Sequence, residues 1–199
     1  MWAAHRLNQA LIIVLLRRLR IAIIRVGHVE GGILERIQFS LAEAFPETNA
    51  FVVSSIMPLP DDAYNPRRGQ YHSSRILSCI RAGHQPAHGD RVLGVTEADL
   101  YVPSLNFVFG EAGRDGSAII SLFRLRPEFY GEPRDVRLFL ERASKEAVHE
   151  LGHTLGLGHC TDPGCVMFFS NSIIDTDRKN RTFCKACHPR VLQNVEKLG

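Results

Sequence analysis

The sequence predicts an α/β fold of α+β character, in which helices pack on a mixed five-stranded sheet and a small, irregular lobe follows. Short Val- and Ile-rich runs alternate with stretches of helical apolar spacing, in the order β-α-β-α-β-β-β-α. A long helical pattern late in the chain precedes a segment with little regular periodicity. The 199 residues, 45% of them hydrophobic, favour one domain that could form two lobes around a cleft.

The first half of the chain supplies two strands and two helices. Leu19–Val26 is rich in Ile and predicts a buried first strand. Apolar residues at helical spacing predict a helix over Gly32–Phe45, which Pro46 would end. The second strand is predicted at Phe51–Ile56 and the second helix at Ser73–Ala82.

The second half adds three strands and the longest helix. Strands are predicted at Arg91–Thr96, Asn106–Gly110 and Ala118–Leu122, the last two joined by a Gly-rich, hairpin-like turn. Pro133 suits the first turn of the long helix. The inner face of that helix would consist of Val136, Leu140, Ala143, Ala147 and Leu151.

One stretch of this helix reads H-E-x-x-H-x-x-G-x-x-H. His149 and His153 stand four residues apart, which places both imidazoles on one helix face and suits two ligands of a tetrahedral zinc ion. Gly156 could end the helix in a left-handed conformation, so that His159 arrives as the third ligand. The fourth position would stay open for water, within reach of Glu150. An isolated H-E-x-x-H could be a helix with solvated or core histidines, but the added Gly and His favour a catalytic zinc site.

Four of the five cysteines form a C-x₄-C pair and a C-x₂-C pair. An odd cysteine count argues against a complete disulfide framework, and these spacings favour a closed, structural zinc site in a reducing compartment. Its ligands would be Cys160, Cys165, Cys184 and Cys187. His188 is an alternative ligand, and a redox role for the C-x-x-C pair is a second alternative. Cys79, among Ile and Leu residues, is expected to be a buried, inert thiol.

The segment after Gly156 is predicted to contain little regular structure, apart from a short helix near Val191–Leu198. Two zinc sites could replace a hydrophobic core there. His159 and Cys160 are adjacent, so the structural zinc would help to hold the third catalytic ligand in place.

The combined pattern resembles the metzincin zinc proteases, and more narrowly the archaemetzincins. The extended histidine motif is typical of metzincins, and Met167 is well placed for the Met-turn beneath the metal. The four-cysteine pattern resembles the archaemetzincins over His149–Cys187, and the resemblance extends upstream through Asp99–Gly110 and Leu125–Gly131. It implies a single catalytic domain over residues 1–199, with an N-terminal lobe at 1–156 and a zinc-stabilised lobe at 157–199.

The resemblance also implies an activity and a substrate site. We expect a zinc metallopeptidase with two Zn²⁺ per chain, in which Glu150 takes a proton from zinc-bound water and delivers it to the leaving amine. The sequence offers no cation or tyrosine near the site as an oxyanion donor, since the last tyrosine is Tyr130. An antiparallel edge strand would bind a peptide or protein substrate through Asn106, Phe107, Val108, Phe109 and Gly110.

Charge and targeting signals bear on partners and location. The net charge of +3 is weak, which makes nucleic acid an unlikely partner. The apolar run from Ala10 to Leu16 is too short to span a bilayer, and no cleavage site follows it. We therefore expect a cytoplasmic monomer. A binding module with a weak or vestigial hydrolytic site is the alternative, since a basic cluster near the second zinc could bind an acidic partner: Arg178, Lys179, Arg181, Lys185 and Arg190.

Overall fold

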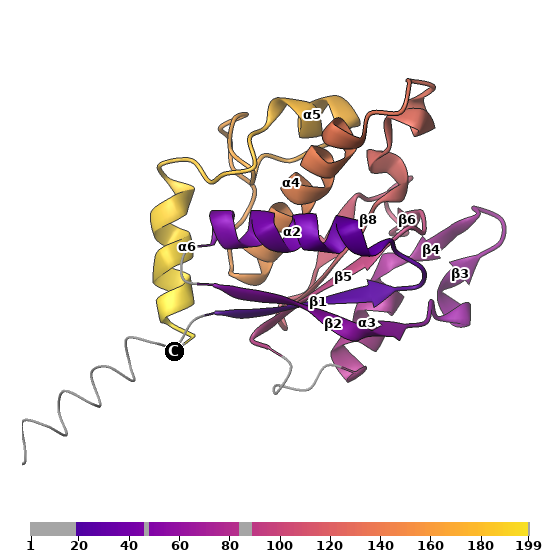
Figure 1. Ribbon diagram of the computed structural model, residues 1–199, viewed down its shortest axis with the longest axis horizontal. Coiled ribbons are helices and arrows are strands. Elements are labelled where there is room, and N and C mark those ends of the chain that lie inside the picture. The colour runs from indigo at the N-terminus through magenta and orange to yellow at the C-terminus, as the bar shows by residue number, and fades with distance from the viewer. Residues whose placement is uncertain (1–18, 46–47, 84–88, 199) are drawn as a thin grey trace, which may run out of the picture.

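Five strands form the main sheet of the computed structural model, in the order β2-β1-β5-β8-β7 (Figure 1). The strands β2, β1, β5 and β8 run parallel to one another, whereas β7 pairs with β8 in the antiparallel sense. The predicted mixed five-stranded sheet is therefore confirmed. The strands are β1 (Arg20–Val26), β2 (Asn49–Met57), β5 (Arg91–Thr96), β7 (Gly110–Ala112) and β8 (Ser117–Ser121).

The structure describes residues 19–45, 48–83 and 89–198. The apolar run from Ala10 to Leu16 and the predicted helix stop at Pro46 lie outside these ranges.

Helices cover both faces of the main sheet. The helices α2 (Gly31–Ala44) and α4 (Val136–Thr154) pack on one face, and α3 (Ser73–Gly83) lies against the other (Figure 1). Successive strand residues point to opposite faces, so Ile21 joins the core under α2 and α4 while Ala22 joins the core under α3. Burial on both faces explains why β1, β5 and β8 are nearly continuous apolar runs, whereas the edge strand β2 is largely exposed or half-buried.

A second, smaller sheet was not predicted. It contains three short strands in the order β3-β4-β6, and strands of two or three residues leave no periodic signal in the sequence. The strands are β3 (Tyr64–Asn65), β4 (Gln70–His72) and β6 (Leu100–Tyr101). Short 3₁₀ turns occur at η1 (Asp61–Ala63), η3 (Phe123–Leu125) and η4 (Pro127–Tyr130).

The predicted edge strand at Asn106–Gly110 is wrong in its position. The edge strand β7 begins only at Gly110, and the preceding residues are irregular apart from one isolated bridge between Val108 and Leu100. The backbone carbonyl of Asn106 accepts hydrogen bonds from two side chains rather than from a strand. The apolar residues of this run are packed against both hydrophobic cores, Phe107 and Phe109 against one and Val108 against the other, without forming a regular strand.

Three further predictions near helices need correction. The long helix α4 begins at Val136, because the Asp135 side chain accepts a hydrogen bond from the Leu138 amide at 2.9 Å, so Pro133 lies before the helix. The C-terminal helix α6 spans Cys187–Glu196 and starts earlier than predicted. Cys79 is exposed, because it points away from the buried side of α3.

The segment after Gly156 is more regular and more apolar than predicted. It contains the helix α5 (Ile173–Arg178), which a Ser172–Asp175 capping box begins. Its buried side chains Val166, Phe183 and Val191 belong to the same core as α2 and α4. Apolar packing therefore supports this segment, and a lobe boundary at residue 156 stays a prediction.

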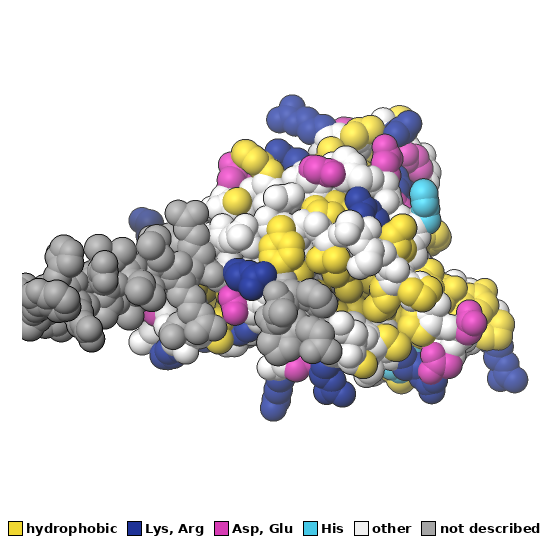
Figure 2. All heavy atoms as spheres, turned by 60° about the horizontal axis from the view of Figure 1, so that its bottom comes forward, with side chains coloured by type: hydrophobic (Ala, Val, Ile, Leu, Met, Phe, Trp, Pro, Cys, Tyr) yellow, Lys and Arg dark blue, Asp and Glu magenta, His cyan; other side chains and the backbone are white. Residues whose placement is uncertain are grey.

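Both apolar and charged side chains lie on the surface that the structure describes. On the face shown in Figure 2, apolar side chains gather toward the right half, and the described Lys and Arg side chains are scattered, many of them near the edges. No helix in the described part of the chain is long and apolar enough to cross a membrane.

Candidate active site and second metal centre

The helix α4 brings two histidines together and the following turn adds a third. The Nε2 atoms of His149 and His153 lie 3.0 Å apart, and a ligand nitrogen of His159 lies within 4.8 Å of both. Two nitrogens of a tetrahedral zinc site with Zn–N bonds of ~2.0 Å are separated by about 3.3 Å. The three histidines could therefore hold one metal ion, and their spacing fits zinc.

Backbone carbonyls fix the tautomers of the two helical histidines. The Nδ1 atom of His149 lies 2.8 Å from the carbonyl oxygen of Val166, and Nδ1 of His153 lies 2.8 Å from that of Leu157. A carbonyl can only accept, so Nδ1 carries the proton in both rings and Nε2 keeps a free lone pair. This arrangement leaves the metal-facing nitrogens ready to coordinate a cation.

Loss of solvent contact lowers the pKa of all three imidazoles, most strongly that of the buried His149, although His159 is exposed. It lowers the pKa of His149 to about 3, an effect to which the positive charge of Lys179 adds. Burial also lowers the pKa of His153 and of His159. Neutral imidazoles at pH 7 are the form that binds a metal ion.

Glu150 shares a cavity of about 420 Å³ with the three histidines. Burial raises the pKa of its carboxyl group well above the usual value, and the nearby carboxylate of Glu146 raises it further. Gly110, at the start of β7, packs directly against this carboxyl group. The site therefore sets a buried carboxyl group between a metal-ligand cluster and the edge of the main sheet.

Met167 and two glycines shape the base of the site. Met167 is fully buried, and a Cβ atom added at Gly152 on α4 would lie 2.5 Å from its sulfur. The absence of a side chain at Gly152 lets the methionine turn pack against the helix that carries the histidines. Gly156 has a φ of 80°, so it adopts the left-handed conformation predicted for the turn toward His159.

Four cysteines converge next to the histidine cluster. The sulfur atoms of Cys160, Cys165, Cys184 and Cys187 all lie within 4.8 Å of one another. The Cys160 and Cys184 sulfurs are 3.8 Å apart, and tetrahedral zinc with Zn–S bonds of ~2.3 Å requires about 3.8 Å. The chemistry of this donor set fits a closed zinc site, to which His188 does not belong.

The cysteine thiols lie in different environments, which shift their pKa values in opposite directions. Backbone hydrogen bonding from the Cys187 amide lowers the pKa of the Cys184 thiol to about 7. Burial raises the pKa of Cys165 and that of Cys187. Four thiolates this close together would repel one another, so the cluster needs a bound cation to hold them ionised.

Backbone contacts join the two clusters. The Cys160 amide donates to the Met167 carbonyl at 2.9 Å, and the His149 ring is held by the next carbonyl back, that of Val166. Cys160 follows His159 directly. The segment Val166–Met167 therefore contacts both clusters. It holds the His149 ring, and it holds Cys160, the residue next to His159.

Every residue predicted to bind substrate lies along the cavity that holds Glu150. This wall is made by Asn106, Phe107, Val108, Phe109 and Gly110. Val102, Leu105 and Phe169 add further apolar surface. The structure thus brings the segment to the site, although most of it is not a strand, and its role in binding stays a prediction.

Sequence reasoning missed one buried ion pair beneath the site. Lys179 Nζ lies 2.9 Å from Glu146 Oε1, and the two side chains are 0% and 3% exposed. Thr176 donates to the same carboxylate oxygen at 3.1 Å. Lys179 is therefore not part of an exposed basic cluster, and Arg181 is paired with Glu43 and Glu141. No local pattern signals the Lys179–Glu146 pair, since the partners are 33 residues apart.

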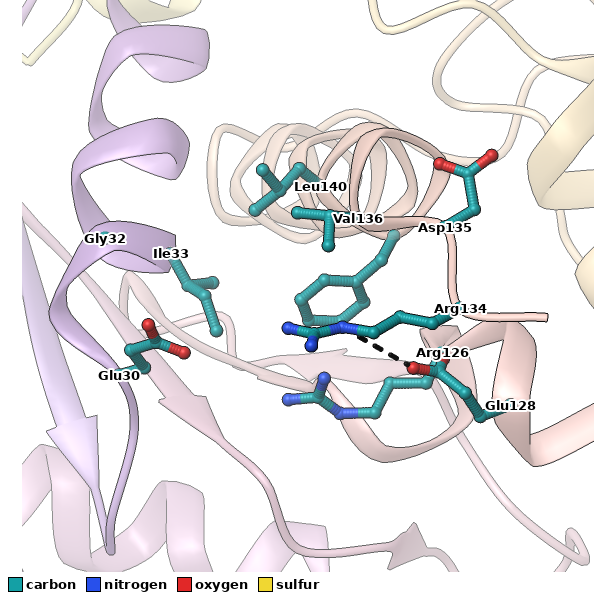
Figure 3. A pocket seen from close by; sticks show the side chains of 10 residues that line it. Glu30, Gly32, Ile33, Arg126, Glu128, Arg134, Asp135, Val136 and Leu140 are labelled. Atoms are coloured by element: carbon teal, nitrogen blue, oxygen red, sulfur yellow. Dashed lines mark ion pairs between the residues drawn. The ribbon is translucent and has the colours of Figure 1, made fainter.

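A separate hollow of about 250 Å³ lies between the start of α2 and the start of α4. The side chains of Arg126 and Arg134 run side by side into it, across from Glu30 (Figure 3). Arg126 is already paired with Glu97 at 2.6 Å, and Arg134 lies 4.0 Å from Glu128. Charges in this hollow are thus largely balanced, and it contains none of the metal-ligand candidates.

The mixed sheet, the histidine cluster on its long helix and the neighbouring cysteine cluster define a zinc-dependent metallopeptidase of the metzincin class. The model of peptidase family M54 matches residues 28–194. An archaemetzincin from Methanocaldococcus jannaschii is 48% identical over 173 residues, which cover 85% of this chain and 90% of that protein. The chain belongs to this family, the archaemetzincins.

Solved structures agree with this assignment. The crystal structure of archaemetzincin from Methanopyrus kandleri matches with a TM-score of 0.78 and 37% identity, over 89% of this chain and 96% of that one. A zinc-dependent peptidase from Methanocorpusculum labreanum matches with a TM-score of 0.76 and 31% identity, over 86% and 99% of the two chains.

Proposed function

We propose that this chain hydrolyses peptide bonds at the three-histidine site, with Glu150 as the general base. One observation carries the proposal: the buried carboxyl group of Glu150 opens into the same cavity as the histidine cluster. His149, His153 and His159 would hold the zinc ion of this family. The fourth position would remain available to water and substrate.

Glu150 would carry out both proton transfers of the reaction. Zinc, when bound, supplies a Lewis acid that polarises a carbonyl and lowers the pKa of water toward about 7. Glu150 would accept a proton from water at its carboxylate and pass it to the leaving amine nitrogen. A raised pKa suits this role, because the carboxyl group must hold the proton between the two transfers.

The edge strand β7 would orient the substrate. It is the last strand of the main sheet, and only one of its sides pairs with β8. The backbone groups on its open side could hydrogen-bond to an extended peptide, which would lay a scissile bond near Glu150. Among the described residues that line the cavity there is no Lys, Arg or Tyr, so backbone amides and the side chains of Ser170 and Asn171 are the candidate donors to a developing oxyanion.

We also propose that the chain binds two zinc ions. The four-cysteine cluster would hold the second one with no open position, and its role would be structural. Its contact with the Met167 segment would help to keep His159 in place. We also expect the protein to be a cytoplasmic monomer.

Cleavage of a peptide library tests the proposed function. We expect the zinc-loaded protein, with two equivalents of zinc by metal analysis, to cleave a subset of peptides. Chelation should abolish cleavage and added zinc should restore it, since the reaction needs the metal. A zinc-loaded protein that cleaves no peptide, or cleavage that survives complete removal of zinc, would contradict the proposal.

A further inference from the structure

The irregular segment that replaces the predicted strand is held in place by side chains outside the cavity. Arg68 Nη2 donates to the Leu105 carbonyl at 3.0 Å and to the Asn106 carbonyl at 2.8 Å. Gln70 Nε2 donates to the same Asn106 carbonyl at 3.0 Å. Three hydrogen bonds, two of them from a charged group, therefore fix two consecutive peptide groups.

The two donors are themselves anchored. Arg68 Nε donates to Gln70 Oε1 at 2.8 Å, and Gln70 Nε2 also donates to Asp99 at 3.0 Å. Gln70 is only 4% exposed, and its amide group is satisfied on both sides. The Arg68 guanidinium also lies 4.3 Å from the ring centroid of Tyr101. These contacts restrict Arg68 to one orientation, although much of its side chain is exposed.

A second arginine completes the support from the other side. Asp99 accepts two hydrogen bonds from Arg124, both at 2.7 Å. The guanidinium of Arg124 lies 4.5 Å from the ring centroid of Phe107. Phe107 in turn packs edge-to-face on Phe109, with the ring centroids 5.1 Å apart. The network thus runs without a break from Arg68 to the aromatic residues of the cavity wall.

The supported segment gives the cavity an apolar wall. Leu105 and Phe107 line the cavity that contains the histidines and Glu150, and Leu105 is 46% exposed. The carbonyls of Leu105 and Asn106 are occupied by Arg68, so this part of the segment offers the substrate side chains rather than free acceptors. An exposed leucine held beside a phenylalanine suits an apolar substrate side chain.

We propose that Arg68, together with Gln70, is a positioning residue that fixes Leu105 and Phe107 as a pocket wall for an apolar side chain of the substrate. The substrate preference in this inference rests on the proposed function. The hydrogen bonds from Arg68 and Gln70 to the Leu105 and Asn106 carbonyls, which we call the clamp, do not depend on it. Removal of Arg68 should free the Leu105 carbonyl and leave the Asn106 carbonyl bonded to Gln70 alone, which should loosen the wall and weaken selection of the apolar side chain. The metal ligands and Glu150 lie on other elements and should be unaffected.

Arg68→Ala tests the inference, with Arg67→Ala as a matched control. Arg67 is its exposed neighbour, and its side chain makes no hydrogen bond or ion pair to any residue that the structure describes. Both variants lose one positive charge from the same loop. Arg68→Lys keeps the charge, but its single ammonium cannot reproduce the planar fork, so its effects should be intermediate.

The first readout is amide hydrogen exchange over residues 102–109, which needs no activity. We expect faster exchange in Arg68→Ala than in the parent, and parental exchange in Arg67→Ala. The second readout is cleavage of two peptides that differ by Leu or Ala at the selected position. The parent should prefer Leu by at least ~10-fold in kcat/KM, and Arg68→Ala should reduce this preference to within ~3-fold. The change should fall on KM, with kcat and zinc content near the parental values.

Different failures point to different errors. Unchanged exchange in Arg68→Ala would overturn the clamp. Faster exchange with an unchanged Leu preference would overturn its role in selection. An equal fall in kcat for both peptides, with loss of zinc, would make Arg68 a general structural residue. A parent protein that cleaves no peptide would overturn the proposed function and the substrate preference with it, while the exchange measurement would still decide the clamp.

Discussion

Gly110 lies so close to Glu150 that no side chain fits between them. A Cβ atom built on Gly110 would lie 2.6 Å from Glu150 Cγ and 2.7 Å from Oε1. The first residue of the edge strand thus limits where the carboxyl group can stand. The contact links the proposed substrate strand to the proposed general base.

Gly110→Ala should impair catalysis more than folding. The added methyl group would push the flexible end of Glu150 aside, and a misplacement of about 1 Å can cost roughly 100-fold in rate. We expect peptide hydrolysis to fall by roughly 10- to 100-fold, with zinc content retained. Initial rates and metal analysis check this. Gly32→Ala is the control, because its Cβ would meet nothing within 4 Å. Parental activity in Gly110→Ala would show that the Glu150 position is not critical.

Cys160→Ser should weaken zinc binding at the histidine site through His159. A hydroxyl group is a poor zinc ligand, so the cysteine site should open and the segment carrying His159 should lose order. We expect catalytic zinc affinity to fall by at least ~10-fold, whereas in a His159→Ala background the same change should cost little more. Zinc titrations of the parent, both single variants and the double variant measure this coupling. Equal costs in both backgrounds would mean that the two sites are independent.

The metal-free protein should lose stability as the pH falls below about 6.5. Burial lowers the pKa of His149 from 6.5 to about 3, so the unfolded chain binds more protons than the folded one between these values. Stability from the neutral ring is complete above pH 6.5 and declines as the pH falls toward 3. Urea unfolding at pH 7.5 and pH 5 should show a larger loss for the parent than for His149→Gln. Equal losses would mean that His149 does not carry this pH dependence.

Lys179→Met should be strongly destabilising. It would leave the carboxylate of Glu146 buried without its cation, and breaking a buried pair from one side costs about 3–5 kcal/mol. Adding Glu146→Gln removes the stranded charge and should recover part of this loss. Chemical denaturation of the two variants and the parent provides the comparison. A loss below ~1 kcal/mol for Lys179→Met would show that Glu146 does not depend on the pair.

Local spacing allowed the grouping of the three histidines, and that of the four cysteines, to be predicted. His149 and His153 share a helix face by the geometry of one turn, and Gly156 adopts the conformation that the third histidine requires. The cysteine pairs similarly bring two ligands each from short segments. The central strands of the sheet were predictable for a related reason. A strand buried on both faces is a run of apolar residues, which can be recognised in the sequence without knowing which strands it pairs with.

The contacts that organise the cavity are not local. Arg68 meets Asn106 across 38 residues, and Lys179 meets Glu146 across 33. A charged residue in a Pro- and Gly-rich loop reads as solvated until its partner is known. The strand before Gly110 was misplaced for the same reason, since the apolar run Phe107–Phe109 does not indicate that distant side chains bond to the Asn106 carbonyl.

The rate of peptide hydrolysis by Glu150→Ala tests the central claim most directly. The parent and the variant should be loaded to equal zinc content and compared on the best peptide from the library. We predict a fall of at least ~100-fold in kcat/KM with folding and zinc binding intact, because the variant lacks the group that accepts and delivers the proton. Hydrolysis at the parental rate by the zinc-loaded variant would show that the reaction does not use Glu150.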